Sequence, residues 1–365
     1  MPNTAIGKLA IRPAREGEFD TDLAALTAQL ASDGVAVLPG VLTVADCHAM
    51  RDGFWDAIEQ MTSKFEGVRT YKSRADEPIA PIHRDDRSTW RNVKELQPMH
   101  GMLLQHWGIG GAREFYRIRT LPSVYRAFEV IHGVPGSQLL SSSDGVSLWL
   151  PYQKEAKYVR EGKPWFHTDH AFADSSERYS VQSWVTAYDV GPRDATLGVI
   201  KGSHKFHAEF AQRFGQDALK EDWYKLQTQE EVDFFVDRGC ELVRVTCPAG
   251  AQVLWDSRLM HCGLGPVGGT QEALRMVIYC SYAPRSRASE RNLKRKREGF
   301  ELQKTTTHRG ELAKRFADQP RTYGKTIQPV QKPRGMEVAE FSSVGKRLFA
   351  LESRPTRKKR LSVLK

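Results

Sequence analysis

The chain has 365 residues and a mass of 41.3 kDa, and its 54 Lys and Arg against 44 Asp and Glu give a formal charge of +10. The excess lies in residues 285–365, which hold 23 basic and 8 acidic residues, whereas residues 1–284 hold 31 and 36. This distribution disfavours a uniformly basic nucleic-acid-binding protein. A hydrophobic fraction of 40% excludes a disordered chain. The sequence contains no apolar run of about 18 residues, so no transmembrane helix is predicted.

The cysteines and the first residues bear on location. The five cysteines contain no CxxC pair, which argues against a disulfide framework or a structural zinc site and favours a reducing compartment. Residues 1–20 lack the apolar core of a signal peptide, so we expect an extended leader. The sequence predicts a cytoplasmic protein, with a nuclear location as the alternative.

Residues 21–145 are predicted to be the helical part of a catalytic domain. Apolar residues at helical spacing indicate helices at residues 22–31, 43–65 and 112–132. Thr43, followed three residues later by Asp46, predicts a capping box at the start of the second helix. The apolar run at 35–38 predicts a buried strand.

Residues 146–284 are predicted to form the β core of the same domain. Short apolar or alternating runs separated by turn residues indicate strands at 146–150, 181–188, 197–200, 242–246, 252–255 and 276–282. A helical insertion is expected at about 209–235. Many short strands predict a mainly β fold of jelly-roll type with flanking helices.

Residues 285–365 are predicted to be a basic C-terminal extension. Leu293, Phe300 and Leu302 indicate a helix at 289–303 that docks on the domain. The remainder is expected to be an extended wrap with a short helix near 344–351. Basic clusters at 294–297 and 357–360 suit nuclear localisation or a nucleic-acid contact, and they equally suit a solvated tail.

A candidate metal site begins with His167 and Asp169. On a strand, residues two apart point to the same face, so the imidazole and the carboxylate would converge. His261, shortly after an apolar run, offers a third ligand. Two histidines and one carboxylate form the facial triad of non-haem Fe(II) oxygenases, which leaves positions for a chelating co-substrate and O₂. Each residue alone is more typical of an ordinary core or turn position; the prediction rests on their conjunction.

Arg275 begins a predicted strand fourteen residues after His261. A buried guanidinium binds a carboxylate through two parallel hydrogen bonds. A 2-oxo dicarboxylic acid could therefore chelate iron at one end and contact Arg275 at the other. Other residues near the triad in sequence could line the pocket or merely pack: Trp165, His170, Phe172, Trp255 and Arg258.

The segment 181–189, the turn and strand at 194–200, and Gly202-Ser203-His204 follow the His-x-Asp pair in an order that resembles the phytanoyl-CoA dioxygenase family. Residues 33–42 resemble the opening of that family, and the resemblance runs from about 23 to 284. Lys201 stands where the family usually has proline.

The resemblance implies a double-stranded β-helix (jelly-roll, cupin-like) core that binds Fe(II) and 2-oxoglutarate. It implies iron binding by His167, Asp169 and His261, and a contact of Arg275 with the distal carboxylate of 2-oxoglutarate. Trp184 and, as a weaker match, Trp149 would line the co-substrate. His204 and His207 receive no metal role.

The implied activity is that of an Fe(II)/2-oxoglutarate-dependent dioxygenase that hydroxylates a small molecule and forms succinate and CO₂. The carboxylate of Asp169 favours hydroxylation, because related halogenases replace it by a small residue to admit chloride. Two alternatives stay open. The oxygenase could act on a nucleic acid or a protein recruited through the basic tail, or the jelly roll could bind metal without oxygenase activity.

Overall fold

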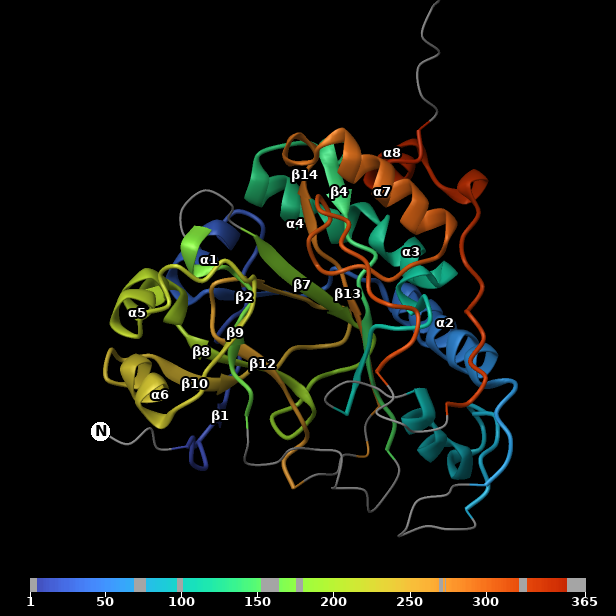
Figure 1. Cartoon of the computed structure of the whole chain (residues 1–365), viewed down its shortest axis with the longest axis horizontal. Coiled ribbons are helices and arrows are strands. Elements are labelled where there is room, and N and C mark those ends of the chain that lie inside the picture. Colours follow the sequence, from blue (N-terminus) through green and yellow to red (C-terminus); the bar gives the residue numbers. More distant parts are fainter. Residues whose placement is uncertain are drawn as a thin grey trace, which may run out of the picture.

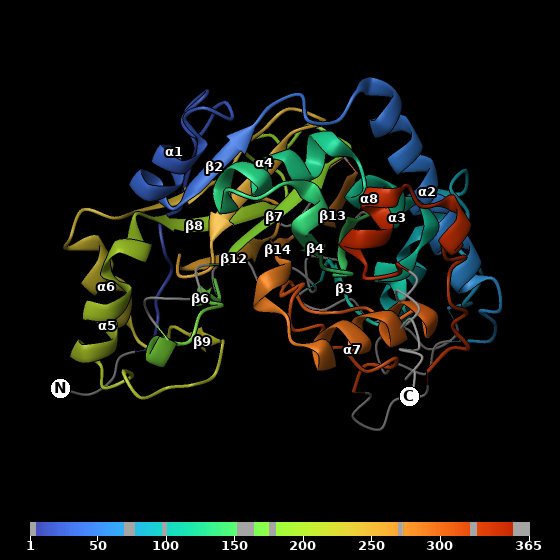
Figure 2. The ribbon, with the colours of Figure 1, turned by 90° about the horizontal axis from the view of Figure 1, so that it is seen from above.

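The computed structural model describes residues 5–68, 77–96, 101–151, 164–174, 180–268, 272, 274–321 and 327–352. In this part of the chain, two six-stranded sheets lie face to face and helices cover their outer sides (Figures 1 and 2). The arrangement confirms the predicted fold class, a jelly-roll core with flanking helices.

The strands of the first sheet are, in spatial order, β2 (Val35–Leu38), β11 (Gln252–Asp256), β7 (Val181–Thr186), β13 (Arg275–Tyr279), β5 (Val146–Trp149) and β3 (Leu103–Leu104). Those of the second are β1 (Arg12–Pro13), β10 (Glu241–Arg244), β8 (Thr196–Lys201), β12 (His261–Leu264), β6 (His167–Thr168) and β9 (Tyr224–Lys225). A separate pair joins β4 (Leu139–Ser141) and β14 (Tyr282–Pro284). Neighbouring strands are antiparallel except for β1 and β10.

Both faces of the first sheet are buried, and its side chains alternate between two cores. Val35 and Val37 of β2 pack with residues of the second sheet such as Val199. Ala36 and Leu38 point the other way, into the core beneath the helices. The strands therefore appear in the sequence as short continuous apolar runs.

The helices α1 (Leu26–Asp33), α2 (Val44–Thr62), α3 (Arg113–Arg119) and α4 (Pro122–His132) lie over the first sheet. The first two were predicted, and the capping box of Thr43 with Asp46 is present. The single helix expected at 112–132 is two helices. Pro122 has no N–H to donate to the preceding turn, so it begins α4 instead of continuing α3.

Two further helices, α5 (His207–Arg213) and α6 (Gln229–Val236), cover the second sheet on its outer side (Figure 2). Phe210, Phe234 and Phe235 pack there against Ile200 and Leu242. The strand β9 lies between these helices in sequence and pairs with β6, next to the metal-site residues.

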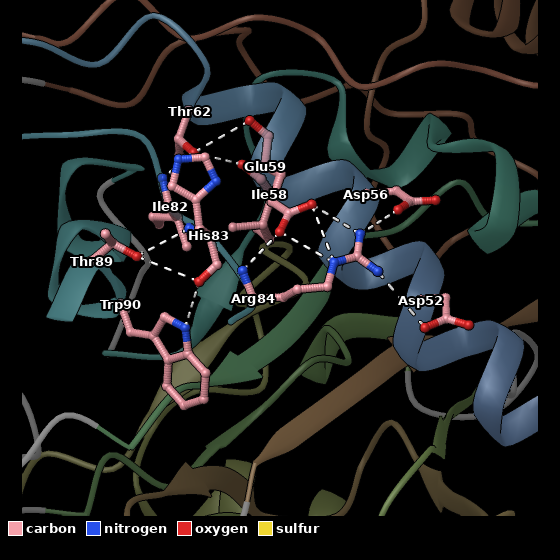
Figure 3. A network of polar contacts seen from close by, with 10 residues as sticks. All are labelled: Asp52, Asp56, Ile58, Glu59, Thr62, Ile82, His83, Arg84, Thr89 and Trp90. Atoms are coloured by element: carbon pink, nitrogen blue, oxygen red, sulfur yellow. Dashed lines mark hydrogen bonds and ion pairs between the residues drawn. The ribbon is translucent and has the colours of Figure 1, made fainter. Parts of the chain in front are cut away.

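Arg84 fixes the segment after α2 to that helix (Figure 3). Its guanidinium donates to the carboxylates of Glu59 and Asp56 on α2, and its backbone N–H donates to Glu59 at 2.7 Å. Deeper in the same contact, the N–H of Ile82 donates to the hydroxyl of Thr62 at 3.0 Å. Ion pairs on the outside and a buried hydrogen bond thus hold this segment.

The basic extension folds back over the domain as far as it is described. Its helices α7 (Glu290–Glu301) and α8 (Ser343–Leu348) match the two predicted helical pieces (Figure 1). The helix α8 packs beside β4, and Leu293 of α7 packs with Leu140 of that strand. Tyr116 of α3 contacts the rings of Phe300, Phe341 and Phe349. The predicted cluster at 357–360 lies outside the described residues. Among those that are described, no helix has the length and apolarity needed to cross a membrane.

Candidate active site

His167 and His261 lie opposite each other on neighbouring antiparallel strands, β6 and β12. Asp169 follows β6 directly, and its backbone N–H donates to the carbonyl of Ser257 at 3.0 Å. The carboxylate oxygens of Asp169 lie 3.7 Å from Nε2 of His167 and 3.5 Å from Nε2 of His261. All three candidate ligand atoms fall within 4.8 Å of one another. The structure thus brings the three predicted ligands together.

The second nitrogen of each imidazole contacts a backbone carbonyl. Nδ1 of His167 is 3.2 Å from the oxygen of Trp165, and Nδ1 of His261 is 2.8 Å from that of Leu259. A carbonyl only accepts, so Nδ1 carries the proton and Nε2 keeps its lone pair for a cation. Two neutral imidazole nitrogens and one carboxylate oxygen are a donor set that fits Fe(II).

The electrostatics of the cluster favour the metal-binding protonation states. Burial, and then the neighbouring His261, lower the pKa of His167, which keeps it neutral. Burial alone would raise the pKa of Asp169, but the adjacent imidazoles hold that pKa well below its usual range. Gln182 of β7 donates to the second carboxylate oxygen of Asp169 at 3.0 Å and orients it.

Arg275 lies on β13, is buried, and lines the cavity that His167, Asp169 and His261 also line. Nε donates to the hydroxyl of Ser147 at 3.0 Å and Nη1 to the carbonyl of Ala195 at 2.9 Å, so the guanidinium is fixed in place. It lies 5.3 Å from the centre of the Trp184 ring. Burial lowers the pKa of Arg275, but guanidinium stays protonated in proteins.

The metal-site residues and Arg275 share one cavity of about 590 Å³. Trp184, Trp165 and Trp255 line it. The family resemblance implied this position for Trp184, whereas Trp165 and Trp255 were candidates because they are near the triad in sequence. Trp149 is paired with Arg275 in the β5–β13 register and packs against Met102 and Ala195, but it is not among the described residues that line the cavity.

Other candidates from the sequence have other contacts. Arg258 forms an ion pair with Asp256 at 2.6 Å. Nε2 of His204 and of His207 contact the carbonyls of Ala31 and His170.

The cavity also contains residues that the sequence analysis missed. Asp144, in the turn before β5, lines it and is buried, and burial raises its pKa to about 7. Thr307, His308, Arg309, Lys314 and Phe316 of the basic extension form another part of the wall. The signal that could have found Asp144 is a charged residue in the small-residue run 141–145; Thr307 and His308 gave none.

A jelly roll in which two histidines and one carboxylate converge in a cavity defines the class of non-haem iron oxygenases. The chain matches the family model of phytanoyl-CoA dioxygenase (PhyH) over residues 30–265. It belongs to this family, and it is an Fe(II)/2-oxoglutarate-dependent enzyme.

Individual proteins are also similar to the chain. Ava biosynthesis cluster protein O from Aspergillus versicolor is 30% identical over 230 residues, which are 61% of this chain and 71% of that protein. The crystal structure of the hypothetical protein JW0805 from Escherichia coli has a TM-score of 0.53 and 14% identity, and the match covers 91% of this chain and 85% of that one. EctD from S. alaskensis, solved with 2-oxoglutarate and 5-hydroxyectoine, has a TM-score of 0.43 and 15% identity over 77% of this chain and 83% of its own.

Proposed function

We propose that the protein hydroxylates a small molecule and forms succinate and CO₂ from 2-oxoglutarate. The observation that carries this proposal is the single cavity in which His167, Asp169 and His261 lie with Arg275. Its volume of about 590 Å³ is that of a small-molecule pocket. The carboxylate of Asp169 favours hydroxylation over halogenation because it occupies the position that a halide would need.

In this proposal each residue has a defined task. His167, Asp169 and His261 hold Fe(II), and Gln182 orients the carboxylate of Asp169. Arg275 binds the distal carboxylate of 2-oxoglutarate, and Trp184 packs beside it. When bound, Fe(II) and 2-oxoglutarate supply the O₂-dependent oxidation that is coupled to decarboxylation. The chain itself positions the substrate and keeps the centre away from bulk water.

Trp149 has a less direct task. We propose that it supports Met102 in the cavity wall, because it packs behind that residue rather than lining the cavity.

The test measures succinate release and co-substrate binding separately. Purified protein with Fe(II), 2-oxoglutarate and O₂ is expected to form succinate slowly without substrate and faster with the correct metabolite from a library. His167→Ala should abolish both rates. Incorporation of ¹⁸O from ¹⁸O₂ into the product would identify hydroxylation. Absence of both succinate formation and 2-oxoglutarate binding to the metal-loaded protein would refute the proposal and favour a metal-binding jelly roll without activity.

Action on a nucleic acid recruited by the extension stays a prediction. Within the cluster at 294–297, Lys296 is buried and donates to the carbonyls of Ser141 and Gly310. Lys294 of the same cluster is exposed. A salt titration of oligonucleotide affinity, with and without residues 353–365, would test the remaining basic residues.

A further inference from the structure

The basic extension builds part of the cavity wall. Thr306 and Ser143 exchange two hydrogen bonds: the N–H of Thr306 donates to the carbonyl of Ser143 at 2.9 Å, and the N–H of Ser143 donates to the hydroxyl of Thr306 at 3.0 Å. The residues that follow them, Thr307 and Asp144, both line the cavity. This pairing joins the extension to the turn before β5.

The same segment is held at a fixed distance from β4. A Cβ atom at Gly310 would lie 2.4 Å from the carbonyl oxygen of Leu140, so only glycine permits this approach. Lys296 also donates to carbonyls on both sides of the contact, those of Ser141 and Gly310. Because several contacts determine its position, the segment can present side chains to a ligand in a defined geometry.

Three neighbouring residues of this wall offer unused hydrogen-bonding capacity. Nε2 of His308 and Oγ1 of Thr307 are buried and have no partner among the described residues. The carboxylate of Asp144, whose residue is 6% exposed, accepts from the N–H of Gly145 at 2.6 Å and from no other described residue. Buried polar atoms without partners are costly, and a ligand in the cavity is one reason to retain them. We call Asp144, Thr307 and His308 the polar wall.

The charges around the polar wall disfavour an anionic substrate. Glu221 and Asp222 line the cavity together with Asp144. Arg309 also lines it, but its Nε donates to Glu311 at 2.8 Å and its Nη1 lies 3.9 Å from Asp222. An anionic group placed at Asp144 would therefore meet a buried carboxylate. The guanidinium of Arg119 lies beside Asp144 but donates to the backbone carbonyls of Gly110 and Asp144. Lys314 is a further cation of the cavity wall.

Aromatic rings supply the apolar part of the cavity. Trp165 stacks on His167 with 4.4 Å between ring centres and an angle of 8°. Trp223 and Phe316 also line the cavity, and Trp223 is 50% exposed in the structure. Rings of this kind bind flat apolar bodies well.

We infer that the polar wall selects a neutral or cationic ring-bearing small molecule that presents an N–H or O–H donor to Asp144. The hydrogen bonds of Thr307 and His308 then fix how the substrate faces the metal-site residues. This inference rests on the proposed function, since it concerns the substrate of the same cavity.

The test uses four probes that differ in one property: indole, 1-methylindole, tryptamine and indole-3-acetate. Their dissociation constants are measured by NMR titration on protein loaded with Zn(II) and 2-oxoglutarate. Indole and tryptamine are expected to bind at least about tenfold more tightly than 1-methylindole, because a hydrogen bond to a buried carboxylate is lost on methylation. Indole-3-acetate should bind most weakly.

Variants assign the effect to the polar wall. Asp144→Asn should weaken tryptamine binding about tenfold and improve the relative affinity of indole-3-acetate. Thr307→Val and His308→Phe should each weaken tryptamine binding, because the ammonium group is a second donor, without changing the affinity for 2-oxoglutarate. Asp52→Asn, on the outer surface of α2, is the matched control and should change no probe.

The outcomes separate the two levels of the proposal. If 2-oxoglutarate does not bind the metal-loaded protein, the proposed function fails. If it binds, and indole and 1-methylindole have equal affinity, the inference is wrong. It is also wrong if indole-3-acetate binds best, if no probe binds, or if Asp144→Asn changes nothing. Retained 2-oxoglutarate binding shows that a variant is folded.

Discussion

Substituting Asp144 by asparagine is expected to stabilise the metal-free protein at about pH 8 and to have little effect near pH 4. Burial raises the pKa of Asp144 to about 7 in the folded protein. In the unfolded chain an aspartate ionises near pH 4. Between these values the folded protein retains a proton that the unfolded chain releases, so the free energy of unfolding falls as the pH rises.

The expected size follows from the two pKa values. A gap of about three pH units lowers the free energy of unfolding of the parent by about 4 kcal/mol. This destabilisation is fully present at about pH 8 and absent below about pH 4. Asparagine removes this contribution but can still accept the hydrogen bond from the N–H of Gly145. The variant should therefore gain stability relative to the parent as the pH rises.

Urea unfolding of both proteins, in the presence of a chelator and at several pH values between about 4 and 8, measures this difference. Asp52→Asn, whose parent carboxylate is exposed, should give a flat difference. The charge of Asp169 raises the pKa of Asp144, and a divalent cation on Asp169 offsets that charge; adding Ni(II) should therefore shrink the difference. A difference that does not depend on pH, or a parent that is more stable at about pH 8, would refute the reasoning.

Three further predictions test the site and the fold. His167→Ala should abolish Ni(II) binding in calorimetry, and retained affinity would contradict the assignment of this ligand. Arg275→Met should weaken 2-oxoglutarate binding to the Ni(II)-loaded protein at least about tenfold while Ni(II) affinity stays the same, with Arg275→Lys intermediate. Thr62→Val should lower the free energy of unfolding by about 1–3 kcal/mol, because the buried N–H of Ile82 loses its acceptor. Ser63→Ala removes an exposed hydroxyl and should cost under about 0.5 kcal/mol, so equal effects of the two would count against this explanation.

The candidate metal site was predictable because its signal lies in short segments, a His-x-Asp pair and a histidine shortly after an apolar run. His167 and Asp169 are two residues apart, and both line the cavity although β6 ends at Thr168. His261 begins β12, which pairs directly with β6. The break between α3 and α4 was also visible in the sequence, since Pro122 cannot continue a helix.

The polar wall was not predictable because its contacts are between distant residues. The hydrogen bond from Ser143 to Thr306 spans 163 residues. No periodicity or short motif records such a pairing. The charge of the extension also favoured a different interpretation, because a segment rich in Lys and Arg is typical of a solvated tail. In the structure Lys296 and Arg309 are buried and form hydrogen bonds with other residues of the protein.

The division between shared and individual parts of the molecule explains what family membership can establish. The family match ends at residue 265, so it contains His167, Asp169 and His261 but neither Arg275 nor the wall segment of the extension. The proposed iron ligands therefore lie in the shared part, and part of the wall that we infer to select the substrate lies outside it. A relative aligned only over the shared part can keep the same metal chemistry and still accept a different molecule. The basic extension, whose charge suggested a role in location or recruitment, forms part of the wall of the same cavity.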